Sequence, residues 1–93
     1  KTTGGAYITV TDDDIIKGIG ELGRYGIFVE PAGATSFMGL RKAISTGVIQ
    51  DDDPVVVINT GNGLKDIRSA MMSVHEAPVI EPNLASLKRY LKK

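Results

Sequence analysis

The pattern of hydrophobic and polar residues divides the chain into short strand-like runs and longer helix-like segments. Residues 6–10 have high β propensity and alternate in character, which predicts a strand. Residues 26–29 form a short apolar segment, which predicts a second strand. Residues 55–58 are four consecutive apolar residues, typical of a strand buried on both faces of a parallel sheet.

Helical periodicity and capping signals predict helices between these strand-like segments. Thr11 followed by three aspartates predicts a helix start, because these residues satisfy and complement the positive end of a helix. This helix should stop between Gly23 and Gly26. A second helix is expected over about residues 32–46, with Pro31 before it and Gly47 after it.

The last third of the sequence predicts two further helices. Asp66 is placed to cap a short helix that runs to about residue 74. An extended connector over residues 77–82 should lead to a last helix with a basic end, whose apolar face is marked by Leu84, Leu87 and Leu91. The alternating order predicts an α/β fold, a three-layer α/β/α arrangement with a mainly parallel sheet.

Composition removes several classes of function. Eleven basic and eleven acidic residues give no net charge, so we expect no nucleic-acid partner. With no cysteine and the single histidine His75, disulfides, thiolate catalysis and a metal site are not expected. No apolar run is long enough for a membrane span. The chain starts at Lys1, and we expect it to be an excised piece of 93 residues forming a single unit.

The candidate site is the loop Thr60, Gly61, Asn62, Gly63, which follows the predicted buried strand. Ligands of open α/β sheets bind beyond the carboxyl ends of the strands, and glycine lets the backbone approach a bound group closely. Glu30 is the second candidate, because it stands before Pro31 and small residues that open a helix. It could face the same crevice as Thr60 or belong to a close-packed junction, and spacing alone does not decide between them.

Two other patterns have plainer interpretations. Gly18, Gly20 and Gly23 match GxGxxG, but they fall inside the first predicted helix rather than in a strand-to-helix turn. Close helix packing is therefore favoured over dinucleotide binding. Lys65 lies beside the loop, but nothing nearby indicates a depressed pKa. A surface lysine, or one that bonds loop carbonyls, is favoured over a catalytic amine.

The segment 29–34, Val-Glu-Pro-Ala-Gly-Ala, followed by 55–66, Val-Val-Val-Ile-Asn-Thr-Gly-Asn-Gly-Leu-Lys-Asp, resembles the C-terminal part of the threonine synthases. More broadly, it resembles the tryptophan-synthase-β-like, fold type II, pyridoxal-phosphate enzymes. The resemblance covers about residues 3–72. It implies that residues 3–74 are the C-terminal part of a larger enzyme domain and that residues 75–93 are a connector and terminal helix.

The resemblance also implies which residues meet the cofactor. Thr60 matches the family residue that hydrogen-bonds the pyridine nitrogen of pyridoxal 5'-phosphate. Gly61, Asn62 and Gly63 would lie beside it, and Glu30 would lie near the cofactor in no assigned role. The Schiff-base lysine and the phosphate loop of the family lie upstream of this segment. No catalytic residue is therefore expected in this chain, and these 93 residues alone should be inactive.

By resemblance, the complete enzyme is a lyase of threonine biosynthesis that converts O-phosphohomoserine and water into threonine and phosphate. It would act on a small amino-acid substrate as a cytoplasmic homodimer. Threonine dehydratase and cysteate synthase remain alternatives within the family. A stand-alone, non-catalytic α/β module that binds a partner, or an anion at the loop amides, is the alternative from another class.

Overall fold

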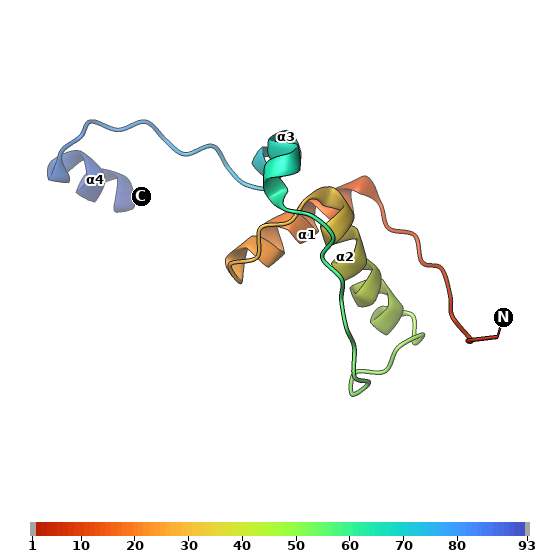
Figure 1. Ribbon diagram of the computed structural model, residues 1–93. Coiled ribbons are helices and arrows are strands. Elements are labelled where there is room, and N and C mark those ends of the chain that lie inside the picture. Colours follow the sequence, from red (N-terminus) through yellow and green to blue (C-terminus); the bar gives the residue numbers. More distant parts are fainter. Residues whose placement is uncertain (1, 93) are drawn as a thin grey trace.

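The computed structural model describes residues 2–92, so Lys1 and Lys93 of the predicted unit lie outside the described residues. Figure 1 shows helices joined by extended segments. The helical elements are, in chain order, α1 (Asp12–Arg24), α2 (Pro31–Ser45), the 3-10 helix η1 (Gly63–Asp66), α3 (Ile67–Met72) and α4 (Leu84–Leu91).

Helix α1 begins where the sequence predicts it. The hydroxyl of Thr11 accepts from the amide of Asp14, and the carboxylate of Asp14 accepts from the Thr11 amide, which completes a capping box. The Thr11 hydroxyl also donates to the Asp14 carboxylate at 2.8 Å, and this bond, together with the one from the Thr11 amide, lowers the pKa of Asp14 below its ordinary 3.8. The helix ends at Tyr25, and the turn continues through Gly26 with a φ of 78°.

Helix α2 packs against α1 and forms the core with it. Ile19, Leu22, Val29 and Ala34 are buried together, and Met38 and Ala43 extend the buried face of α2. The crossing is close because Gly18 has no side chain: a Cβ there would lie 2.7 Å from Cγ of Met38. An exposed ion pair between Arg41 and Glu21, at 2.6 Å, adds a second link between the two helices.

The predicted α/β fold with a mainly parallel sheet is wrong for this chain. Within residues 2–92, strand pairing is confined to one isolated antiparallel bridge between Val29 and Asn62. Residues 6–10 and 55–58 are extended but have no strand partner, and residues 26–28 form a turn and its exit. The run at 55–58 is not buried on both faces, because Val56 and Ile58 are 89% and 69% exposed. A strand in the interior of a sheet needs a neighbouring strand on each side, and residues 2–92 contain no strand that pairs with residues 55–58.

The terminal segments extend away from the α1–α2 body. In Figure 1, α4 lies at the end of a long extended connector, apart from the other helices, and residues 2–10 lead away on the other side. The radius of gyration is 17.7 Å, with extents of 63 × 28 × 20 Å. A compact domain of this length would have a radius of about 12 Å. The connector and last helix are therefore present as predicted, but α4 buries none of its residues.

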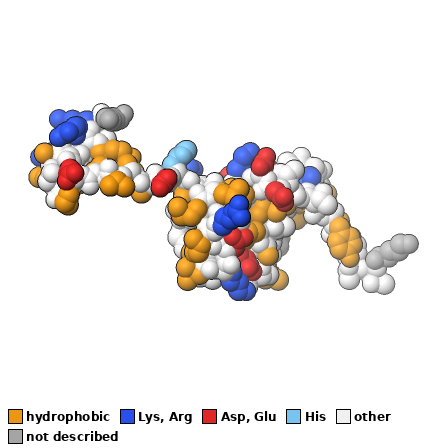
Figure 2. Space-filling view, turned by 90° about the horizontal axis from the view of Figure 1, so that it is seen from above, with side chains coloured by type: hydrophobic (Ala, Val, Ile, Leu, Met, Phe, Trp, Pro, Cys, Tyr) orange, Lys and Arg blue, Asp and Glu red, His pale blue; other side chains and the backbone are white. Residues whose placement is uncertain are grey.

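Apolar side chains remain exposed on both the body and the terminal arm, where Figure 2 shows them as orange patches. They include Tyr7, Val56, Ile58, Val79, Leu84 and Leu91. No helix within residues 2–92 combines the length and the apolar character needed to cross a membrane.

Candidate functional site

The glycine loop is joined edge to edge with the segment that enters α2. The Glu30 amide donates to the carbonyl of Gly61 at 3.0 Å, and the Gly63 amide donates to the carbonyl of Phe28 at 3.1 Å. These two bonds flank the Val29–Asn62 bridge. Residues that are distant in sequence are thus held side by side, and the loop directly contacts the start of α2.

A third anchor holds the approach to the loop. The hydroxyl of Ser36, on α2, lies 2.8 Å from the carbonyl oxygen of Ile58. The first turn of α2 also passes close to this stretch, because a Cβ on Gly33 would lie 3.1 Å from the Cβ of Val29 and 3.6 Å from the Cα of Asn59. Thr60 therefore stands between two anchored carbonyls, that of Ile58 before it and that of Gly61 after it.

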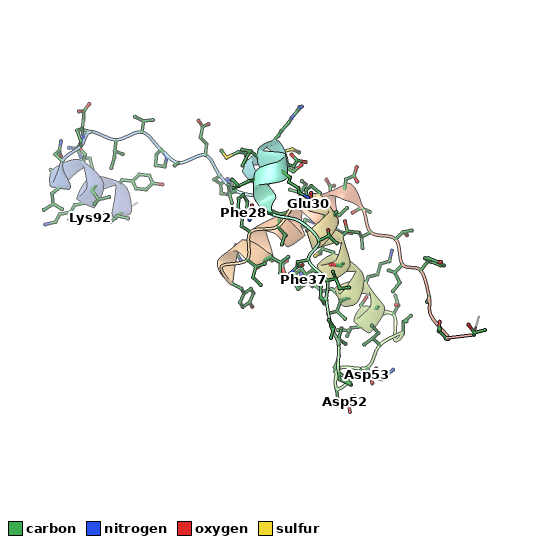
Figure 3. All side chains as sticks on the ribbon, viewed as in Figure 1. Phe28, Glu30, Phe37, Asp52, Asp53 and Lys92 are labelled. Carbon is green, nitrogen blue, oxygen red and sulfur yellow. The ribbon has the colours of Figure 1, made fainter. Side chains whose placement is uncertain are left out.

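Both loop glycines are required by close contacts. A Cβ on Gly61 would overlap the carboxyl group of Glu30, and a Cβ on Gly63 would overlap the ring of Phe28. Figure 3 shows Phe28 and Glu30 near the N-terminal end of α2, close to α3, and Asp52 and Asp53 beyond the opposite end of α2. Neither loop glycine has a positive φ, so close approach rather than a left-handed backbone explains them.

Glu30 places a negative charge against the loop. Its Oε1 lies 3.8 Å from Nζ of Lys65, and the Glu30 side chain is 19% exposed while that of Lys65 is 64% exposed. Glu30 is also the residue preceding α2, but its side chain makes no capping hydrogen bond. The carboxylate is instead directed to the loop that holds Thr60, so the 30–34 segment is a close-packed junction against this loop, and a binding role for Glu30 stays a prediction.

Thr60 is exposed, so its hydroxyl is available to a ligand. Asn62 is also exposed, and its side-chain oxygen accepts from the Leu64 amide at 2.9 Å, which starts η1. The structure thus brings Thr60, Gly61, Asn62, Gly63 and Glu30 together. Lys65 is the surface lysine that was one of its two predicted roles, with a side chain 64% exposed, and its Nζ lies 3.8 Å from Oε1 of Glu30.

Three contributors to the site were not identified from sequence. Ser36 positions Ile58, Phe28 fills the space over Gly63, and Lys65 is the partner of Glu30. The small residues that open α2 were a signal of close approach in this region, but nothing in the spacing singled out Ser36. The ring of Phe28 was counted only as part of an apolar run.

Downstream of the loop, Asp66 caps α3 as predicted. Its carboxylate accepts from the amide and the hydroxyl of Ser69, at 3.0 and 2.7 Å. Those hydrogen bonds lower the pKa of Asp66 below its ordinary 3.8, because they stabilise the ionised carboxylate. Across residues 2–92, His, Asp and Glu side chains do not form a group of three or more that could hold a metal ion.

The GxGxxG glycines lie inside α1, as predicted from the position of Thr11. Gly18 faces Met38, and a Cβ on Gly20 would lie 2.9 Å from the carbonyl oxygen of Ser73, at the end of α3. Gly18 and Gly20 permit helix packing, and the three glycines do not form a phosphate-binding turn.

Comparison with known proteins shows which proteins this chain resembles. The chain is 44% identical over 92 residues to the threonine synthase of Methanocaldococcus jannaschii, covering 98% of this chain and 23% of that protein. It is 39% identical over 89 residues to the threonine synthase of Methanosarcina acetivorans, covering 95% and 22%. The match to the threonine synthase of Halalkalibacterium halodurans is 43% over 75 residues, covering 80% and 21%.

The chain spans less than a quarter of the length of the curated relatives that it matches. Residues 1–61 match the family described as pyridoxal-phosphate dependent enzyme. That match takes in Glu30, Ser36 and Thr60 and ends at Gly61, within the anchored loop. It covers well over half of the chain, which therefore belongs to the family of pyridoxal-phosphate dependent enzymes.

Proposed function

We propose that these residues belong to a threonine synthase, in which the Thr60 loop binds the ring edge of pyridoxal 5'-phosphate. The observation that carries this proposal is an exposed Thr60 on a loop anchored on both sides. The similarity to threonine synthases over nearly the whole chain supports the choice of reaction.

The residues present fit the cofactor. A threonine hydroxyl is neutral and can donate a hydrogen bond to an unprotonated pyridine nitrogen. The bound cofactor supplies an electron sink, whose strength depends on what the protein places at its ring nitrogen. With the carboxylate of Glu30 turned to Gly61 and Lys65, the hydroxyl of Thr60 would hold the ring nitrogen and would give a milder sink. Gly61, Asn62 and Gly63 would form the adjoining edge of the binding site, with Glu30 near it in no assigned role.

The rest of the catalytic machinery comes from outside residues 1–93. A lysine that binds the cofactor covalently and a loop that binds its phosphate are supplied by other parts of a longer polypeptide. In this proposal residues 3–74 complete the cofactor domain, and residues 75–93 are a connector and terminal helix. Exposed apolar side chains such as Val56 and Ile58 support packing against more polypeptide over a stand-alone module. The complete enzyme works as a cytoplasmic homodimer.

The reaction follows from this assignment. The substrate is O-phosphohomoserine: phosphate leaves from Cγ and water adds its hydroxyl at Cβ, which gives threonine. This chain's residues hold and orient the cofactor ring and exclude water from its edge, and the 93 residues alone are inactive. The printed names of the relatives favour threonine synthase over threonine dehydratase or cysteate synthase.

The test uses the intact polypeptide that carries these residues. We expect a visible absorption band of bound cofactor and phosphate release from O-phosphohomoserine. Thr60→Ala should weaken cofactor binding about tenfold, as loss of one hydrogen bond to the ring predicts, and Thr60→Ser should retain binding. A polypeptide that binds no cofactor, or one that releases ammonia from threonine but no phosphate from O-phosphohomoserine, would overturn the proposal.

A further inference from the structure

The side chain of Glu30 is enclosed by the loop it contacts. Its amide binds Gly61, its carboxyl group occupies the space that a side chain on Gly61 would fill, and its Oε1 faces Lys65 at 3.8 Å. Lys65 stands at the far side of the same loop, where its own amide donates to the carbonyl of Asn62 at 3.1 Å. Glu30 therefore contacts the loop both at Gly61 and at Lys65.

We propose that Glu30 and Lys65 are a pair of positioning residues that clasp the loop from Thr60 to Lys65 and so fix the hydroxyl of Thr60. The role of the loop in holding the cofactor rests on the proposed function, whereas the clasp itself is a property of these residues. Glu30 acts through the loop and through Lys65, and it does not touch the reacting atoms.

Charge and burial explain why an acid occupies this position. Removing a carboxylate from water is costly unless a cation or hydrogen-bond donor compensates it. The side chain of Glu30 is 19% exposed, and Lys65 is the cation that the structure places beside it. A neutral residue of the same length could fill the space next to Gly61, but it would not hold Lys65 to the start of α2.

The ion pair between Glu21 and Arg41 is the natural control. It is shorter, at 2.6 Å, and its side chains are 39% and 51% exposed. It joins α1 to α2 away from the loop. Loss of this pair should alter the helix contact and leave the loop unaffected, which separates a specific clasp from a general loss of surface charge.

The experiment compares Glu30→Gln, Lys65→Gln and the double variant in the intact polypeptide, with Lys65→Arg as a rescue and Glu21→Gln as the control. The first readout is hydrogen exchange of the amides in residues 59–65 without cofactor. Each single variant should speed exchange about two- to fivefold, the range for partly exposed ion pairs. The double variant should be no faster than the single ones, and Lys65→Arg and Glu21→Gln should match the unaltered protein.

The second readout is the rate at which pyridoxal 5'-phosphate leaves, followed by its absorption. It should rise in the same variants and by a similar factor. Unchanged exchange at 59–65 in Glu30→Gln, or additive effects of the two substitutions, would overturn the clasp. Failure of the unaltered polypeptide to bind the cofactor would overturn the proposed function instead, and the exchange rates would still decide on the clasp.

Discussion

The hydroxyl of Ser36 bridges two carbonyl oxygens, at 2.7 Å from Gly33 in its own helix and at 2.8 Å from Ile58 in the segment before Thr60. A hydroxyl has one proton to donate, so the two carbonyls share or compete for it. This hydroxyl is the side-chain link between α2 and the approach to the loop. The position of Thr60 thus depends on a helix that begins 29 residues earlier in the sequence, at Pro31.

Ser36→Ala should loosen the stretch from Ile58 to Thr60. The Ile58 carbonyl loses its protein donor, and water replaces it in part because the bond is exposed, so the loss of stability should be about 1 kcal/mol. Chemical denaturation of the intact polypeptide and hydrogen exchange at residues 59–61 would measure it. Ser45→Ala is the control, because that hydroxyl bonds the Lys42 carbonyl within α2. Equal effects of the two substitutions would contradict a specific link to Ile58.

Gly63→Ala should displace the ring of Phe28. The added methyl group would occupy the space of the ring, and relief requires the ring or the loop to move, at a cost of about 1–3 kcal/mol. Gly39→Ala is the matched substitution within α2, where a Cβ meets no atom within 4 Å. It should stabilise the helix by up to about 1 kcal/mol. Thermal melts of both variants would show opposite shifts; a stable Gly63→Ala variant would mean that the ring has room to rotate away.

Gly20→Ala tests the packing role of the GxGxxG pattern. A methyl group there meets the backbone carbonyl of Ser73, which cannot rotate away as a flexible side chain can, so α1 and α3 must separate. We expect destabilisation of about 1–3 kcal/mol. Gly23→Ala, with open space around its Cβ, should be neutral or slightly stabilising. Cofactor retention that changed in proportion to stability alone would agree with packing, and altered affinity for a dinucleotide would contradict it.

Acid should weaken the helix caps at Asp14 and Asp66. Hydrogen bonds from Thr11 and Ser69 lower the pKa of these carboxyls below 3.8 in the folded chain. A depressed folded pKa contributes stability above the unfolded pKa, and this contribution is lost as the pH falls through the folded pKa. Helicity followed by circular dichroism from pH 6 to pH 2 should decline on the acid side of 3.8. Asp66→Asn, which still caps a helix, should remove its share of that decline.

Local signals in the sequence were sufficient to predict where the helices begin. Thr11 and Asp66 cap the helices they were expected to cap, and α2 begins at Pro31, one residue before its predicted start. Capping is decided within a few residues, so it can be read without knowledge of the rest of the fold. The grouping of Glu30 with Thr60 was one of two open interpretations, and the structure supplied the backbone bond to Gly61 that joins them.

The sheet could not be predicted correctly because strand pairing is a non-local property. The β-branched run at 55–58 has the composition of a buried strand, but its burial depends on neighbours that residues 2–92 do not provide. Ser36 escaped notice for a related reason. Its partner lies 22 positions away, and no spacing rule connects a helical serine to the carbonyl of a distant extended segment.

The bridge between Val29 and Asn62 has a consequence for the order of folding. The chain between Val29 and Asn62 contains all of α2 and the extended segment after it. Its conformational entropy must be lost before the bridge can form. Helix α2 can form early from local contacts, and the Thr60 loop can settle only afterwards. Partial melting of α2 should therefore disorder the Thr60 loop at the same temperature, which makes ordering of this loop a late step of folding.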